Sequence, residues 1–124
     1  MIPAIVGLSG PVLTAEERDW LLAANPAGVI LFGRNVVDRA QLRSLTDSLR
    51  DLLGWPNLPI LIDQEGGRVA RLGPPHWPAT PTAAAFAQLY AVAPGSAMAA
   101  ARAHAQVIGA MLRDAGITVS AMPV

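Results

Sequence analysis

Residues 58–71 read Leu-Pro-Ile-Leu-Ile-Asp-Gln-Glu-Gly-Gly-Arg-Val-Ala-Arg, an apolar run that ends abruptly in charged residues and glycines. Ile60, Leu61 and Ile62 are apolar without alternation, which is typical of a parallel strand covered on both faces. We expect Asp63 to stand at the carboxyl end of that strand. In open α/β sheets and in barrels of parallel strands, ligands bind at this end, because its loops vary without disturbing the core.

Asp63 and Glu65 are the acidic residues at this strand end. In extended backbone they would point the same way, roughly 6.5 Å apart, and paired carboxylates at such distances serve glycoside hydrolysis. The Gly66-Gly67 turn makes the true separation unreadable from sequence, so they are not assigned as a catalytic pair. Asp63 can accept hydrogen bonds from two sugar hydroxyls. For Glu65 the alternative is that it caps a turn or pairs with an arginine such as Arg34.

The glycine pair also affects the arginines that follow it. Glycine tolerates positive φ, so the chain can reverse sharply and bring Arg68 and Arg71 back over the strand end. One of them is expected to bind a ligand and the other to brace the site. A nucleotide-binding open sheet is a third, weaker hypothesis, because the chain has no G-x-G-x-x-G motif and no lysine for a phosphate-binding loop.

Other apolar segments alternate with helical segments along the chain. Further strands are predicted at Ala4–Leu8, Ala27–Phe32 and Ile117–Val124. Helices are predicted at Ala15–Ala24, from Asp38 to Gly54, and at Ser96–Ala115. Such alternation predicts a parallel sheet with right-handed crossovers, but it does not distinguish an open sheet from a closed one.

The helix ends carry residues that favour capping. Thr14 and Glu17 have the spacing of a capping box at the start of the first helix. Gly54 and Gly116 follow the second and third helices, where glycine in the left-handed conformation commonly ends a helix.

Apolar periodicity predicts which helix faces are buried. The second helix carries a stripe of Leu42, Leu45, Leu49, Leu52 and Leu53, and the third is predicted to bury Val107, Ile108, Met111 and Leu112. The stretch 73–81 is predicted to be a long exposed loop, because its prolines lack a backbone donor and fix φ. Trp77 is expected to anchor this loop, and the alternative is that it stacks on a sugar.

The composition narrows the classes of partner. The 124 residues suffice for one domain, and 52% are hydrophobic while only 15% are charged, so some apolar surface is expected to have its partner elsewhere. Nine arginines and no lysine balance nine acidic residues. Neither nucleic acid nor an anionic membrane is therefore expected as a partner.

The absence of cysteine excludes disulfides and thiolate metal sites, and a cytoplasmic location is expected. His76 and His104 lack metal-ligand spacing, so neither a metal nor a cofactor is expected. The segment 1–8 has no basic region and is predicted to be a strand rather than a signal peptide. The alanine-rich stretch 82–101 is too weakly hydrophobic to be expected to span a membrane.

Three segments of the sequence resemble glycoside hydrolase family 3. They are Ile30–Asn35 (ILFGRN), Ile62–Arg71 (IDQEGGRVAR) and Gly116–Val124 (GITVSAMPV). Within that family the likeness is greatest to bacterial single-domain β-N-acetylhexosaminidases that act in peptidoglycan recycling. The resemblance covers essentially the whole chain.

The resemblance implies a (β/α)8 TIM barrel, which needs roughly 250 residues. Residues 1–124 would be the N-terminal part of that single catalytic barrel, with about four parallel strands, three helices and no second domain. It also implies a retaining mechanism, in which an aspartate attacks the anomeric carbon and a histidine on a mobile loop acts as acid and base. Both groups are expected beyond Val124, so no catalytic residue is assigned here and the chain alone is expected to be inactive.

For the site, the resemblance implies that Asp63 accepts hydrogen bonds from sugar hydroxyls and that Arg71 helps to hold an N-acetylglucosamine ring. Supporting roles fall to Arg34, Asn35, Glu65 and Arg68. The expected partners are an N-acetylglucosamine-containing saccharide or muropeptide and the C-terminal half of the barrel. The alternative is a catalytically silent α/β module that binds a saccharide without cleaving it.

Overall fold

The structure is a computed structural model that describes residues 1–122, so positions 123 and 124 of the predicted fourth strand lie outside the described residues. The strands of the main sheet are β1 (Ile2–Gly7), β2 (Pro26–Leu31), β3 (Ile60–Ile62) and β6 (Val119–Ser120). Two short strands, β4 (Gln64–Gly66) and β5 (Val69–Ala70), form an antiparallel hairpin. The helices are α1 (Ala15–Ala24), α2 (Arg39–Leu53), α3 (Ala83–Val92) and α4 (Pro94–Asp114), and a 3-10 helix spans Gly33–Asn35.

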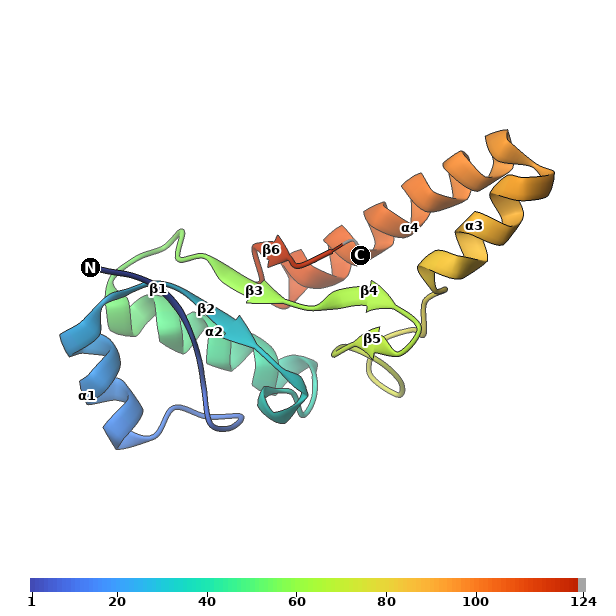
Figure 1. Cartoon of the computed structure of the whole chain (residues 1–124). Helices are drawn as coiled ribbons and strands as arrows, with labels where there is room; N and C mark the ends of the chain where they lie inside the picture. The colour runs from blue at the N-terminus through green and yellow to red at the C-terminus, as the bar shows by residue number, and fades with distance from the viewer. Residues whose placement is uncertain (123–124) are drawn as a thin grey trace.

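All strand pairs of the main sheet are parallel, in the order β1-β2-β3-β6 (Figure 1). Successive strands of this sheet are connected through helices, as parallel neighbours require. The predicted α/β class and the four parallel strands are therefore confirmed.

The hydrophobic core lies between one face of this sheet and the helices. Val29, Leu31, Ile60 and Ile62 have no exposed surface. They belong to one cluster with Leu21 of α1, Leu42, Leu45 and Leu49 of α2, and Ile108, Met111 and Leu112 of α4. The predicted leucine stripe of α2 thus faces the core.

The other face of the sheet is largely uncovered. The strand register places Gly7, Ile30, Leu61 and Val119 in one row, and paired residues of neighbouring strands point to the same face. On this face Val119 is 39% exposed and Ile5 is 51% exposed. Leu61 of β3 is half-buried on this face, so within the described residues β3 is fully covered on the Ile60 and Ile62 side and only partly covered on the other.

The structure adds a helix that the sequence analysis did not predict, and the prediction of three helices is corrected to four α-helices within residues 1–122. Thr82 caps α3 by accepting a hydrogen bond from the Ala85 N–H group over 3.2 Å. Pro94 begins α4, a position that proline favours. The two helices pack together as a hairpin that extends away from the sheet (Figure 1).

One residue of α4 that was predicted to be buried is exposed in the structure. Val107 is 45% exposed rather than buried, because it lies about 100° around the helix from the buried Ile108.

Within residues 1–122, no helix combines the length and the apolarity that crossing a bilayer requires.

The stretch 73–81 is a loop in which most residues are exposed, as predicted, and Trp77 is its buried residue. Trp77 is only 3% exposed and packs in the core cluster, which confirms that it anchors the loop. Arg39 of α2 holds the loop from outside: its Nε donates to the His76 carbonyl over 2.6 Å, and its guanidinium lies 5.5 Å from the Trp77 ring centroid. The loop is therefore fixed to the body of the domain.

The predicted capping box at α1 is confirmed. The Glu17 N–H group donates to the Thr14 hydroxyl over 3.1 Å, and the Glu17 carboxylate accepts from the N–H groups of Thr14 and Ser9 over 3.0 and 2.7 Å. Partial burial acts to raise the pKa of the Glu17 carboxyl, but these hydrogen bonds outweigh it and hold that pKa below its ordinary value.

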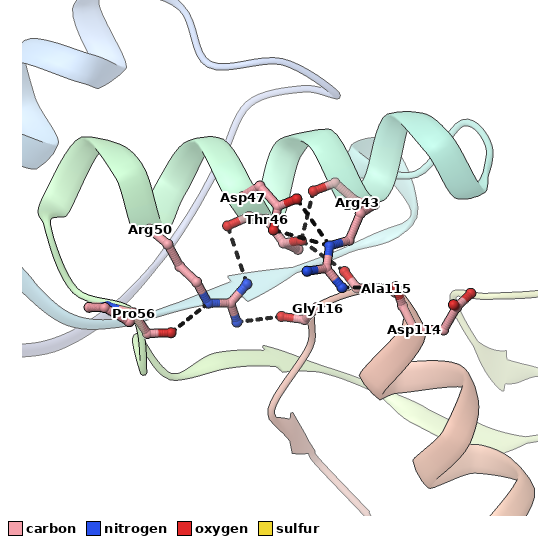
Figure 2. Close-up of polar contacts among 8 residues, drawn as sticks. All are labelled: Arg43, Thr46, Asp47, Arg50, Pro56, Asp114, Ala115 and Gly116. Carbon is pink, nitrogen blue, oxygen red and sulfur yellow. Dashed lines mark hydrogen bonds and ion pairs between the residues drawn. The ribbon is translucent and has the colours of Figure 1, made fainter.

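The junction between α4 and β6 is bound to α2 by polar contacts (Figure 2). The Thr46 hydroxyl donates to the Ala115 carbonyl over 2.8 Å, and the Arg50 guanidinium donates to the carbonyl oxygens of Gly116 and Pro56. Burial lowers the pKa of Arg50. Gly116 has φ of +75°, and a Cβ atom there would collide with the Thr46 hydroxyl. These contacts fix where β6 joins the sheet.

Replacing Gly116 by alanine is expected to destabilise the protein more than the same change at Gly54. Both glycines have positive φ, +75° and +61°, but no atom lies within 4 Å of a Cβ built at Gly54. The strain of the left-handed conformation costs about 1–2 kcal/mol at each site, and the collision adds about 1–3 kcal/mol at Gly116 alone. Thermal unfolding followed by circular dichroism measures both variants. Equal losses would show that the contact with Thr46 is not rigid.

Candidate functional site

The carboxyl ends of the parallel strands meet along one edge of the sheet. Leu31 is paired with Ile62, so Phe32 and Asp63, which follow them, begin the loops at this edge. The Ala121 N–H group donates to the Ile62 carbonyl over 2.9 Å and keeps the end of β6 beside β3. Asp63 therefore lies at the strand end where the sequence predicts it.

Asp63 and Arg71 form an ion pair at this edge. The Nη2 group of Arg71 donates to Oδ2 of Asp63 over 3.0 Å, and the two side chains are 31% and 27% exposed. Within residues 1–122, Oδ1 of Asp63 makes no hydrogen bond, and the buried Nε of Arg71 has no partner. The pair combines an open carboxylate acceptor with a fixed cationic donor.

The β4-β5 hairpin brings Arg71 back to Asp63. Gly66 and Gly67 have φ of +118° and +58°, and a Cβ atom at either would collide with Pro81 or Thr82 respectively. The Gly67 N–H group also donates to the Thr80 carbonyl over 2.9 Å. The turn therefore needs glycine both for its φ angles and for its close packing against the segment before α3.

Gln64 is a buried polar residue of the site that the sequence analysis missed. It has no exposed surface, and its side-chain amide is hydrogen-bonded to the backbone of Arg71 and Leu72. Alternation along an extended chain places Gln64 on the same covered face as Ile60 and Ile62. That pattern is the signal that predicts a buried amide in need of partners.

Asn35 and Arg34 join the loop after β2 to the loop after β1. Asn35 is fully buried: its Nδ2 donates to the carbonyls of Leu8 and Gly10 over 3.2 and 2.8 Å, and its Oδ1 accepts from the Phe32 N–H group over 2.8 Å. Arg34 Nε donates to the Leu8 carbonyl over 2.7 Å, and its guanidinium lies 4.7 Å from the Phe32 ring centroid. Neither side chain contacts Asp63 or Arg71 through a hydrogen bond or an ion pair.

Glu65 and Arg68 lie apart from the Asp63–Arg71 pair. Glu65 lines a pocket of about 200 Å³ together with Phe86 and His104 from the α3-α4 hairpin. In the described part of the chain Glu65 forms no ion pair, so pairing with Arg34 is not what the structure shows. Arg68 is exposed on the hairpin turn and makes no hydrogen bond or ion pair with residues 1–122. Only Arg71 returns to the strand end.

This arrangement suits recognition of a polyhydroxylated ligand. A carboxylate accepts hydrogen bonds from two hydroxyls, and a guanidinium donates several in a fixed geometry. Among residues 1–122, no three histidine or acidic side chains are grouped so that they could hold a metal ion.

The sequence matches the glycosyl hydrolase family 3 N terminal domain over residues 5–124. It is 42% identical over 120 residues to a β-hexosaminidase of Xanthomonas campestris pv. campestris (strain B100), covering 97% of this chain and 36% of that protein. It is 39% identical to a β-hexosaminidase of Stenotrophomonas maltophilia (strain R551-3), covering 97% of this chain and 35% of that protein. The chain thus spans about a third of the length of these curated relatives.

Solved structures show the same fold. NagZ from Neisseria gonorrhoeae, in complex with N-trifluoroacetyl-D-glucosamine, superposes with a TM-score of 0.90 at 32% identity, covering 98% of this chain and 35% of that one. A family 3 β-N-acetylglucosaminidase from Paenibacillus sp. str. FPU-7 has a TM-score of 0.78 at 28% identity, covering 96% of this chain and 22% of that one.

Changing Asn35 to aspartate is expected to cost about 2–3 kcal/mol of folding free energy. The variant keeps the shape of the side chain but loses the donors to Leu8 and Gly10, and it buries an acceptor against their carbonyls. Asn57 is exposed, and the same change there is expected to alter stability by about 0.5 kcal/mol or less. Urea unfolding of both variants measures the difference. A loss at Asn35 no larger than that at Asn57 would exclude Asn35 as the link between the two loops.

Proposed function

The chain belongs to glycosyl hydrolase family 3, and from that membership we propose that it forms the N-terminal part of the catalytic barrel of a β-N-acetylhexosaminidase. In this proposal residues 1–124 are one part of a single barrel, and Asp63 and Arg71 bind the sugar. Arg34, Asn35, Glu65 and Arg68 support the site, and no metal or cofactor takes part.

The ion pair at the end of β3 carries the proposal. Asp63 keeps one carboxylate oxygen without a partner among residues 1–122, and Arg71 holds the other oxygen at 3.0 Å. A sugar ring that meets this edge finds an acceptor for its hydroxyls beside a donor for its ring substituents. Ligands bind at this end of parallel strands in α/β barrels, which gives the same location independently.

The uncovered sheet face supports the proposal of a barrel. The remaining two thirds of such an enzyme would complete this barrel. Ile5 and Val119 expose apolar side chains on the face that points away from the helices. In a closed barrel of parallel strands, that face lines the interior and is packed with side chains. The nucleophilic aspartate and the histidine acid and base of the proposed retaining reaction lie outside this chain, which by itself does not hydrolyse glycosides.

The proposed substrates are peptidoglycan-derived fragments that end in N-acetylglucosamine, processed in the cytoplasm. The names of the relatives support the class of sugar: two are β-hexosaminidases, one is a β-N-acetylglucosaminidase, and NagZ was solved with an N-acylated glucosamine.

A fusion of this chain to the C-terminal two thirds of the Xanthomonas campestris β-hexosaminidase tests the proposal. The fusion is expected to hydrolyse an aryl N-acetyl-β-glucosaminide. Asp63→Ala is expected to lower its kcat/KM by about 100-fold or more, because the sugar hydroxyls lose their hydrogen bonds to the charged carboxylate. Asp47→Ala is the matched control: it breaks the Arg43–Asp47 ion pair, which also measures 3.0 Å but is about half exposed on α2.

Unchanged kcat/KM in the Asp63→Ala fusion would refute the role of Asp63 in binding. The C-terminal part must come from an intact β-hexosaminidase that is itself active. If the fusion then binds N-acetylglucosamine but cleaves nothing, the result would favour the saccharide-binding alternative over the enzyme.

A further inference from the structure

We propose that Gln64 is a positioning residue for the Asp63–Arg71 pair, because its side-chain amide fixes the backbone from which the Arg71 guanidinium reaches Asp63. The inference deepens the proposed function and rests on the assignment of that pair to sugar binding. It adds a residue whose effect on the sugar is expected to pass through Arg71 alone.

The side chain of Gln64 is hydrogen-bonded to the backbone at the end of the hairpin that connects Asp63 to Arg71. Oε1 accepts from the N–H groups of Arg71 and Leu72, each over 2.9 Å, and Nε2 donates to the Leu72 carbonyl over 2.9 Å. One buried side chain thus satisfies three backbone groups at the point where the hairpin returns. Asp63 immediately precedes Gln64 in the chain, so the amide links the backbone beneath both members of the ion pair.

Only a glutamine side chain offers this combination. The site needs an acceptor for two N–H groups and a donor for one carbonyl, and a neutral amide supplies both. Glutamate at neutral pH has no donor for the Leu72 carbonyl, and asparagine is shorter by one methylene. The requirement is one of geometry, since Gln64 itself has no exposed surface with which to touch a ligand.

The other side of the hairpin is fixed by backbone packing. Gly66 and Gly67 lie against Pro81 and Thr82, so the turn cannot move outward without losing this contact. Gln64 holds the returning strand from the inside. Together they set the position of the Arg71 backbone, and a displacement of about 1 Å at such a group can cost 100-fold in rate.

A purely structural role for Gln64 makes a different prediction from a positioning role. If Gln64 only stabilises the fold, its loss lowers activity by the same factor whether or not Arg71 is present. If it acts through Arg71, its kinetic effect disappears once Arg71 has been truncated, while its effect on stability persists. A double-mutant cycle separates the two.

The experiment uses Gln64→Met, which keeps the length and apolar stem of the side chain but removes all three hydrogen bonds. In the full 124-residue chain, amide hydrogen exchange at Arg71 and Leu72 is expected to accelerate at least tenfold, while Thr46→Val, which removes a buried hydrogen bond elsewhere, leaves these two amides unchanged. This arm does not depend on activity. Unchanged exchange at Arg71 and Leu72 would overturn the inference.

The kinetic arm uses the fusion with the β-hexosaminidase relative. Gln64→Met is expected to lower kcat/KM for the aryl N-acetylglucosaminide by about 10–100-fold, mostly through KM, and by less than twofold in the Arg71→Ala background. An equal loss in both backgrounds would overturn the positioning role. If Gln64→Met accelerates exchange while Arg71→Ala leaves kcat/KM unchanged, the sugar-binding assignment fails, and the geometric link between Gln64 and Arg71 stands.

Discussion

Gly66 and Gly67 reverse the chain directly beyond β3 in a space that leaves no room for a side chain, and the site depends on this reversal. Their φ angles of +118° and +58° and their packing against Pro81 and Thr82 determine where the chain returns. Gln64 then fixes the returning backbone, and Arg71 meets Asp63 at 3.0 Å. An acidic side chain at a strand end thereby becomes an acceptor with a cation beside it.

The sheet supports the proposal that the ligand binds at this edge. Its helices cover the Ile60 and Ile62 face, while Ile5 and Val119 remain exposed on the other. In family 3, the proposed barrel would bury that second face and place the loops after β1, β2 and β3 around one opening. Asn35 already joins two of those loops through its hydrogen bonds to Leu8 and Gly10.

Much of this could be predicted from the sequence, because local rules and tertiary structure agree here. The apolar runs specify the strands, Thr14 with Glu17 begins α1, and Gly54 and Gly116 follow the ends of α2 and α4. What the sequence could not show depends on packing at a distance. Helix α3 has little apolar periodicity, so its partner α4 and the cap at Thr82 decide its conformation. The contacts of Glu65, Arg68 and Gln64 depend on the hairpin geometry, which two glycines leave open until the rest of the fold constrains them.

The most direct measurement of the central claim is a crystal structure of the fusion with N-acetylglucosamine bound. The account predicts that a carboxylate oxygen of Asp63 lies about 2.6–2.8 Å from a sugar hydroxyl and that the Arg71 guanidinium touches the same ring. A sugar bound at the carboxyl ends of the strands with neither residue in contact, or bound elsewhere, would contradict it.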